Sequence, residues 1–240
     1  MSKKTAIVFG GSRGIGAAIV EALAKDGYNV ALTYVSSQPN PMPEIADATI
    51  KAYQVDIRDP KSVSGIFEAV AADFGSASDC VVANAGINVP PGPLGQFSDE
   101  KFRDLVEVNI VGAYNILKAA SANIADGGTI IGLTTSLVRF AAPGLGPYSA
   151  TKAAVECLLR SMQKELAGRG VRVNGVAPGP VDTDLFRSGK DEAAVQRSAA
   201  MSPFNRVGDP KEIGEVVAFL ASDKSSWIAG QIVQPNGGLV

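Results

Sequence analysis

Tyr148 and Lys152 are the residues of this chain best suited to proton chemistry, and they stand four apart in Tyr148-Ser-Ala-Thr-Lys152. In a helix this spacing puts both side chains on one face, so that an ammonium group can lie beside a phenol. A neighbouring positive charge lowers the pKa of a phenol from its usual value near ~10. Because the chain contains no histidine, the pair is a candidate acid–base group, although the same spacing also occurs in ordinary exposed helices.

A second candidate site lies near the N-terminus, where a short apolar stretch from Thr5 to Phe9 leads directly into a glycine-rich loop. A helical pattern of apolar residues comes next and closes at Asp26-Gly27. A strand, a glycine loop and a helix in this order direct backbone N–H groups at one point, which suits a pyrophosphate. A plain glycine-rich turn is the alternative. The loop residues predicted to bind a cofactor are Gly10, Ser12, Arg13, Gly14, Ile15 and Gly16.

The elements that must position these residues alternate along the whole chain between short apolar stretches and longer helical patterns. Such alternation predicts an α/β fold, in which a parallel sheet is covered by helices on both faces. The predicted strands are 5–9, 29–35, 50–55, 79–84, 128–133, 171–177 and 231–234, and the predicted helices are 15–26, 61–74, 99–125, 148–167 and 210–222. We expect one domain over residues 1–240.

The segment from Ser36 to Pro43 departs from this alternation because it holds three prolines in eight residues. Proline interrupts helices, so the second crossover is predicted to lack a full helix. The adenosine end of a cofactor site there would be unusually open.

Composition excludes several classes of function. The net charge of -2 gives no basic field for nucleic acid. The start lacks a signal-peptide pattern and no apolar run approaches the ~20 residues needed to span a bilayer, which predicts a cytoplasmic protein. Cys80 and Cys157 are isolated in the sequence, so two buried, reduced thiols are expected rather than a disulfide or a metal site.

These motifs, taken together and in this order, resemble the short-chain dehydrogenase/reductase family, in the single-domain branch of 3-oxoacyl-carrier-protein-reductase-like enzymes. The resemblance covers nearly the whole chain and implies a doubly wound Rossmann fold with a mostly parallel seven-stranded sheet. In the glycine motif, Phe9 stands where the family has Thr, which affects the usual hydroxyl contact that steadies the neighbouring loop. The other matching residues are Asp56-Ile57, Asn84-Ala-Gly86, Asn109, Thr135 or Ser136, Tyr148-x-x-x-Lys152, Pro178-Gly179 with Thr183, and Asn236-Gly-Gly238.

The resemblance also implies catalytic roles. Tyr148 would be the acid or base on the substrate oxygen, Lys152 would lower its pKa and hold the nicotinamide ribose, and Asn109 would pass protons toward water. The hydroxyl that orients the carbonyl group usually stands thirteen positions before the Tyr in this family, which is Thr135. Ser136 is the alternative if the loop is one residue shorter.

The choice of cofactor depends on the residues after the second predicted strand, where an NAD-preferring fold usually carries an acid for the ribose 2′-hydroxyl. Here that position is Tyr34, and no carboxylate appears between it and Glu44. Arg13 could pair with a 2′-phosphate, and Ser36 and Ser37 could donate hydrogen bonds to it. NADP(H) is therefore favoured over NAD(H), unless Arg13 is merely a solvated loop residue.

The remaining cofactor contacts come from the resemblance alone. Asp56 could instead cap the helix after it, although Asp59 suits that task better. The expected contacts are Asp56 and Ile57 around the adenine, Asn84, Ala85 and Gly86 against the ribose, and Pro178, Gly179, Val181 and Thr183 at the nicotinamide carboxamide.

The segment from about 184 to 202 mixes charged and small residues and is expected to be a mobile substrate lid. Arg139 and Arg187 could meet an acidic substrate tail. The candidate pocket walls are Leu94, Phe97, Phe140, Leu145 and Phe186.

The sequence thus predicts an NADP(H)-dependent reductase of a ketone, an aldehyde or a 3-oxoacyl thioester, with Tyr148 as the acid. The cofactor would supply the hydride chemistry and the protein the alignment. An NAD-dependent alcohol dehydrogenase and a non-catalytic dinucleotide-sensing protein are the alternatives. The expected partners are a small-molecule substrate and further copies of the chain, in a homotetramer or a dimer, with neither metal nor nucleic acid.

Overall fold

A seven-stranded sheet forms the centre of the computed structural model, which describes residues 3–39 and 41–240. The strands run in the order β3-β2-β1-β4-β5-β6-β7, and every neighbouring pair is parallel. They are β1 (Thr5–Phe9), β2 (Asn29–Tyr34), β3 (Ile50–Gln54), β4 (Ser78–Ala83), β5 (Ile124–Leu133), β6 (Arg172–Val176) and β7 (Ile232–Val233). The predicted doubly wound α/β fold is therefore confirmed.

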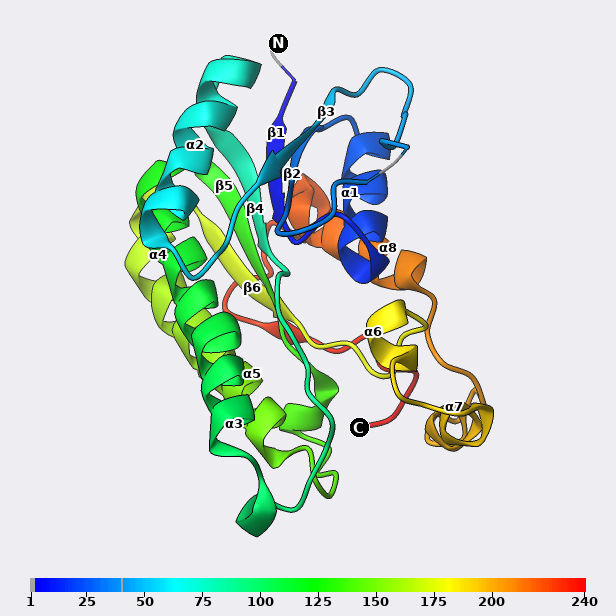
Figure 1. Ribbon diagram of the computed structural model, residues 1–240. Helices are drawn as coiled ribbons and strands as arrows, with labels where there is room; N and C mark the ends of the chain where they lie inside the picture. The colour runs from blue at the N-terminus through cyan, green and yellow to red at the C-terminus, as the bar shows by residue number, and fades with distance from the viewer. Residues whose placement is uncertain (1–2, 40) are drawn as a thin grey trace.

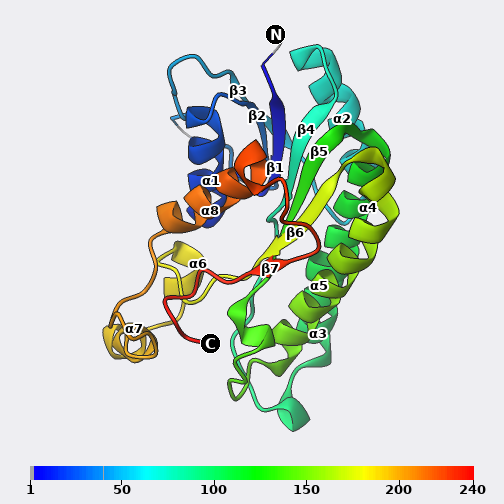
Figure 2. The same ribbon diagram turned by 180° about the vertical axis from the view of Figure 1, so that it is seen from behind.

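Helices cover both faces of the sheet, as Figures 1 and 2 show from opposite sides. Helices α1 (Gly14–Lys25) and α8 (Pro210–Ala221) lie on one face. The other face carries α2 (Pro60–Phe74), α4 (Ala113–Asn123) and α5 (Gly146–Leu166). Three shorter helices, α3 (Asp99–Val106), α6 (Asp184–Arg187) and α7 (Glu192–Ala199), lie beyond the carboxyl ends of the strands.

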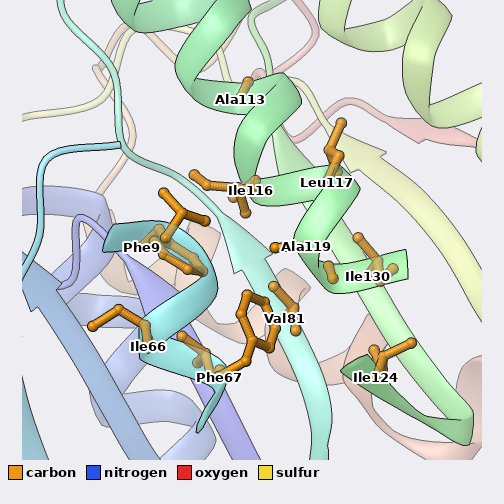
Figure 3. Close-up of a cluster of buried hydrophobic side chains, with 14 of the residues drawn as sticks. Phe9, Ile66, Phe67, Val81, Ala113, Ile116, Leu117, Ala119, Ile124 and Ile130 are labelled. Atoms are coloured by element: carbon orange, nitrogen blue, oxygen red, sulfur yellow. The ribbon is translucent and has the colours of Figure 1, made fainter. Parts of the chain in front are cut away.

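Strand β1 is buried along its whole length because both of its faces are covered. Ile7 and Phe9 belong to the core between the sheet and α2, α4 and α5, whereas Ala6 and Val8 belong to the core against α1 and α8. This explains why the strand reads as a continuous apolar run instead of an alternating one. In the first core the rings of Phe9 and Phe67 lie 6.1 Å apart between centroids (Figure 3).

Helix α2 is capped at its N-terminus by Asp59, whose carboxylate accepts hydrogen bonds from the backbone N–H groups of Lys61 and Ser62. Pro60 occupies the first helical position, where a missing N–H costs nothing. The N-cap is therefore Asp59, and Asp56 is not used as the helix cap.

The helix predicted over 99–125 is confirmed as a continuous helical stretch from Asp99 to Asn123, but a π-helical turn that was not predicted lies in its middle. Residues Glu107–Gly112 form a π-helical turn between α3 and α4, and β5 already begins at Ile124. The turn packs closely against the loop after β3, since a Cβ on Gly112 would lie 2.5 Å from Cδ1 of Ile57. Local apolar periodicity cannot reveal such an insertion because it is decided by packing.

The second crossover contains no helix in residues 35–39 and 41–49, as predicted from its prolines. Asn40, in the middle of that segment, lies outside the described residues, as do residues 1 and 2.

Cysteine burial differs from the prediction at one position. Cys80 is buried in β4, but Cys157 is exposed on α5, so the prediction of two buried thiols was wrong there. Burial raises the pKa of the Cys80 thiol to about 12. In the part of the chain that the structure describes, no helix is both long and apolar enough to cross a membrane.

Candidate active site

The glycine loop comes after β1 and opens α1, and its shape depends on the absence of side chains. Gly10 and Gly14 have φ values of +76° and +54°, a backbone conformation that favours glycine. A Cβ on Gly16 would lie only 2.0 Å from the carbonyl oxygen of Gly10. That oxygen accepts a hydrogen bond of 2.8 Å from Nδ2 of Asn84. The loop therefore holds its backbone at the start of α1, in the arrangement that suits a dinucleotide pyrophosphate.

A hydroxyl group from the neighbouring strand supports this loop. The N–H of Gly10 donates to Oγ1 of Thr33 at 3.1 Å, and the N–H of Gly11 donates to the Thr33 carbonyl at 3.0 Å. Thr33 thus supplies a hydroxyl beside the loop, although Phe9 has none to offer. Thr33 was not among the residues predicted from the sequence, where its only signal is a polar residue inside an otherwise apolar strand.

The loop lies where the strand order reverses between β1 and β4. Asn84, Ala85 and Gly86 come directly after β4, and a Cβ on Gly10 would come within 2.8 Å of the Cα of Ala85. In open α/β sheets, ligands bind in the crevice at this switch point, beyond the carboxyl ends of the strands. The structure therefore brings the predicted glycine loop and the predicted ribose-contacting residues together.

Asn109 sits in the π-helical turn and is almost completely buried. Its Oδ1 accepts from the N–H of Ile87 at 2.8 Å, and its Nδ2 donates to the Ile87 carbonyl at 2.9 Å. Nδ2 also reaches Oγ1 of Thr151, on α5, at 3.2 Å. A Cβ on Gly86 would lie 3.0 Å from Oδ1 of Asn109 and 3.2 Å from Nζ of Lys152. Asn109 and Lys152 therefore both lie close to the end of β4.

Tyr148 and Lys152 lie in the first two turns of α5, where Pro147 helps to start the helix. Nζ of Lys152 donates to the carbonyl of Leu133, at the end of β5, over 3.1 Å. Burial raises the pKa of Tyr148 to about 12 and lowers the pKa of Lys152 to about 8. In the described residues no hydrogen bond joins the two side chains, and the Tyr148 pKa moves opposite to the lowering expected from the charge of Lys152.

The hydroxyl groups of Thr135 and Ser136 differ in how they are used. Ser136 donates its hydroxyl to the carbonyl of Ala177 at 2.8 Å. Oγ1 of Thr135 instead accepts from the N–H of Leu137 at 3.3 Å, which leaves its O–H available to a ligand. This arrangement favours Thr135 over Ser136 as the group that orients a carbonyl.

A cavity of about 660 Å³ adjoins these residues, and its walls are largely apolar. Tyr148, Thr135 and Ser136 line it together with the predicted nicotinamide contacts and Ile15 of the glycine loop. The predicted lid supplies one wall through α6, α7 and the residues around them. The lining residues from this segment and its flanks are Pro178, Gly179, Pro180, Val181, Thr183, Leu185, Phe186, Ser188, Gly189, Lys190, Ala194, Ser198 and Met201.

The predicted pocket walls are only partly correct. Leu145 and Phe186 line the cavity, but Leu94, Phe97 and Phe140 do not. Leu94 instead begins a short turn that is exposed to solvent.

The two arginines expected to meet an acidic substrate tail are already paired within the chain. Nη1 of Arg139 lies 3.5 Å from Oε2 of the buried Glu156. Arg187 binds Asp182 through two of its nitrogens, at 2.5 and 2.8 Å. Neither arginine lines the cavity.

Both predicted adenine contacts already have partners within the chain, because Asp56 is paired with Arg58 and the side chain of Ile57 is buried. The carboxylate of Asp56 accepts from the backbone and the guanidinium of Arg58, which lowers the pKa of Asp56. The side chain of Ile57 is buried in the core against Gly112. Ile57 can therefore face a ligand only with its backbone.

The predicted contacts to a 2′-phosphate lie at the open end of the glycine loop. Arg13 is exposed at the N-cap position of α1, and no carboxylate of the described residues pairs with it within 4.0 Å. Ser36 and Ser37 are exposed just after Tyr34, which ends β2, and Ser12 is half-buried in the loop.

We expect Lys152→Met to stabilise the fold at neutral pH. The side chain is only 7% exposed, and burial lowers its pKa from 10.5 to about 8. Above pH 10.5 the amine is neutral in both the folded and the unfolded chain, so its burial costs no stability. As the pH falls from 10.5 to about 8, the unfolded chain is protonated before the folded one, and the folded state loses stability until the full penalty is reached. Removing the charge should therefore raise the free energy of unfolding at pH 7 by up to roughly 3 kcal/mol.

Urea unfolding at several pH values measures this gain, with Lys164→Met, on the exposed face of α5, as the matched control. The gain should shrink between pH 8 and 10.5 for Lys152→Met and be absent for Lys164→Met. A loss of stability at pH 7 would contradict the prediction.

The fold and this site define the class of protein: a doubly wound α/β chain with a nucleotide-type glycine loop and a Tyr–Lys pair beside a cavity of substrate size. Residues 10–240 match the family described as enoyl-(acyl carrier protein) reductase. The chain is 38% identical, over 252 residues, to the short-chain type dehydrogenase/reductase of Picea abies, with 99% of this chain and 92% of the relative covered. It belongs to the short-chain dehydrogenase/reductase family of oxidoreductases, as the motifs predicted.

Two further similarities concern proteins described with NADPH. The chain is 38% identical, over 257 residues, to the NADPH-dependent aldehyde reductase-like protein, chloroplastic, of Arabidopsis thaliana, covering 100% of this chain and 95% of the relative. A blue fluorescent protein from a metagenomic library, solved in complex with NADPH, has a TM-score of 0.87 and 32% identity, covering 99% of this chain and 98% of that one.

Proposed function

We propose that this chain is an NADP(H)-dependent reductase of aldehydes or ketones, in which Tyr148 protonates the carbonyl oxygen. The observation that carries the proposal is the cavity that Tyr148 and Thr135 share with the end of the glycine loop. Bound NADPH would supply a hydride to the carbonyl carbon. The glycine loop fits the dinucleotide because Gly16 has no Cβ, which would collide with the loop backbone. The start of α1 can therefore pack closely on the loop and direct its backbone N–H groups at the pyrophosphate.

Thr135 and Tyr148 act on the substrate oxygen. Thr135 donates its free O–H to the carbonyl oxygen and thereby orients it. Tyr148 gives up its proton to the same oxygen as negative charge develops there. Its pKa of about 12 keeps the phenol protonated at neutral pH, so the acid is ready before the reaction begins.

Lys152 and Asn109 would help to restore the proton that Tyr148 gives up. An ammonium at Lys152 stabilises the phenolate left after the transfer, since opposite charges favour each other's ionised form. Asn109 holds both backbone polar groups of Ile87 and reaches Thr151 on the next helix. A path along which the proton is replaced from water would begin at this network.

The choice of cofactor is tested at Arg13. We expect the wild-type chain to reduce an aldehyde faster with NADPH than with NADH. Arg13→Gln should lower kcat/KM for NADPH roughly tenfold, because a charge-assisted hydrogen bond to the 2′-phosphate is lost. The rate with NADH should not change.

Steady-state kinetics with both cofactors check this expectation. Arg103→Gln, at an exposed position on α3, is the matched control. Equal use of NADH and NADPH by the wild-type chain would support the NAD-linked alcohol dehydrogenase instead. An equal loss with both cofactors would remove the assigned role of Arg13.

The substrate is inferred to be a carbonyl compound with an apolar body, because the cavity walls are mostly apolar. The chloroplastic relative, described as an NADPH-dependent aldehyde reductase-like protein, supports an aldehyde. A 3-oxoacyl thioester stays a candidate. A screen of carbonyl compounds that monitors NADPH consumption distinguishes these classes.

We infer a homotetramer, with a dimer as the alternative. Two aromatic side chains at and after α8 are exposed: Phe219 by 43% and Trp227 by 98%. A further copy of the chain that covered these two side chains would remove their apolar surface from water. Light scattering of the purified chain decides between the two assemblies. The cytoplasmic location stays a prediction.

A further inference from the structure

The substrate cavity contains one unexpected charge. Among the described residues that line it, Lys190 alone carries a charged side chain. The other lining residues are apolar, are glycine, or carry a hydroxyl or an amide. A lone cation on such a wall can recognise an anionic group on the substrate.

Local geometry fixes the position of the Lys190 side chain. Helix α6 ends before Gly189, whose φ of +72° turns the chain, and the N–H of Lys190 donates to the carbonyl of Arg187 at 3.0 Å. This turn places Nζ of Lys190 4.2 Å from the centroid of the Phe186 ring, which also lines the cavity. Nζ donates to the Phe186 carbonyl as well. The ammonium is therefore held near the wall with further N–H groups to donate.

Lys190 also has no partner of opposite charge. In the described ranges, 3–39 and 41–240, no carboxylate oxygen lies within 4.0 Å of its Nζ. The neighbouring Arg187, in contrast, is paired with both Asp182 and Glu192. Lys190 is exposed to solvent as a residue, yet partial desolvation of its ammonium lowers its pKa. An anion placed beside it would favour its charged form.

We infer that Lys190 binds a carboxylate of the substrate, and that the preferred substrates of this chain are oxo acids. The inference rests on the proposed function, because Tyr148 must act on the carbonyl at the other end of the same molecule. Tyr148 and Lys190 reach the cavity from separate elements, α5 and the segment between α6 and α7. A lysine acts as a point charge, without the fork of an arginine that suits bidentate binding.

The test compares an aliphatic ω-oxo carboxylate with its methyl ester and with an ω-oxo alkyl phosphate of the same length, using NADPH. Wild-type enzyme should prefer the acid to the ester by about tenfold or more in kcat/KM, the effect of a charge-assisted hydrogen bond. Lys190→Met should remove the preference by raising KM for the acid, with the ester unchanged. Lys190→Arg should keep most of it. Lys101→Met, at an exposed position on α3, controls for the loss of one charge.

The outcomes separate this inference from the proposed function. An acid preference that survives Lys190→Met overturns it, as does a wild-type preference for the ester or for the phosphate. So does a higher KM for NADPH in Lys190→Met with the acid preference intact, which would place Lys190 on the cofactor. Each of these outcomes leaves the proposed reductase standing. A wild-type chain that oxidises NADPH with none of the three substrates overturns this inference, and the proposed function falls with it only if the wider screen of carbonyl compounds also gives no NADPH oxidation.

Discussion

Replacement of Tyr148 by Phe is expected to lower kcat for carbonyl reduction by roughly 10²–10⁴-fold, the range of a lost general acid. Phe keeps the ring that fills the cavity wall and removes only the hydroxyl. The proton that neutralises the substrate oxygen then has no donor at that position, since Thr135 can orient the oxygen but holds its proton far more tightly. NADPH affinity should change little, because the glycine loop is untouched.

Single-turnover kinetics measure the rate of carbonyl reduction, and fluorescence titration measures the affinity for NADPH. Tyr114→Phe is the matched control, because Tyr114 is exposed on α4. That variant should retain wild-type turnover. If Tyr148→Phe turned over at the wild-type rate, Tyr148 would not be the acid, and the proposed mechanism would fall with it.

Much of the fold could be predicted because its determinants are local. Apolar stretches such as Thr5–Phe9 form strands that are buried on both faces, and Asp59 with Pro60 marks a helix start. The π-helical turn at Glu107–Gly112 could not be predicted, since the surrounding residues continue a helical pattern. Its position depends on the close packing of Gly112 on Ile57, a contact between segments far apart in the chain.

The candidate active site could likewise be predicted from the sequence only in part. Spacing alone places Tyr148 and Lys152 on one helical face, and a glycine loop that follows a strand predicts a dinucleotide-binding site. The support given by Thr33 comes from another strand, through pairing that the sequence does not display. The direction of the Tyr148 pKa depends on burial, which a pattern of charges along a helix does not reveal.

The residue proposed to bind the carboxylate of the substrate could not be predicted from the sequence either. Arg187 was predicted to meet an acid but is paired with Asp182. Lys190, three residues later, reaches the cavity because Gly189 turns the chain between them. A choice between two cations so close in the sequence depends on which has a partner within the fold.

Replacement of Gly16 by Ala is expected to weaken NADPH binding by roughly 100-fold, the upper end of what overpacking costs. The new Cβ would lie 2.0 Å from the Gly10 carbonyl oxygen and 2.7 Å from Nδ2 of Asn84. Both atoms belong to the hydrogen bond that joins the loop to the end of β4. The loop must move away from the helix, and the backbone N–H groups that would bind the pyrophosphate lose their common direction.

Gly65→Ala is the matched control for this substitution. Gly65 lies in the exposed middle of α2, and a Cβ there would meet nothing within 4 Å. The same added methyl group should raise the free energy of unfolding by about 0.5–1 kcal/mol and leave NADPH affinity unchanged. Circular dichroism and urea unfolding establish whether Gly16→Ala still folds before its affinity is measured. A folded Gly16→Ala chain that binds NADPH as tightly as the wild type would show that the cofactor does not use this loop.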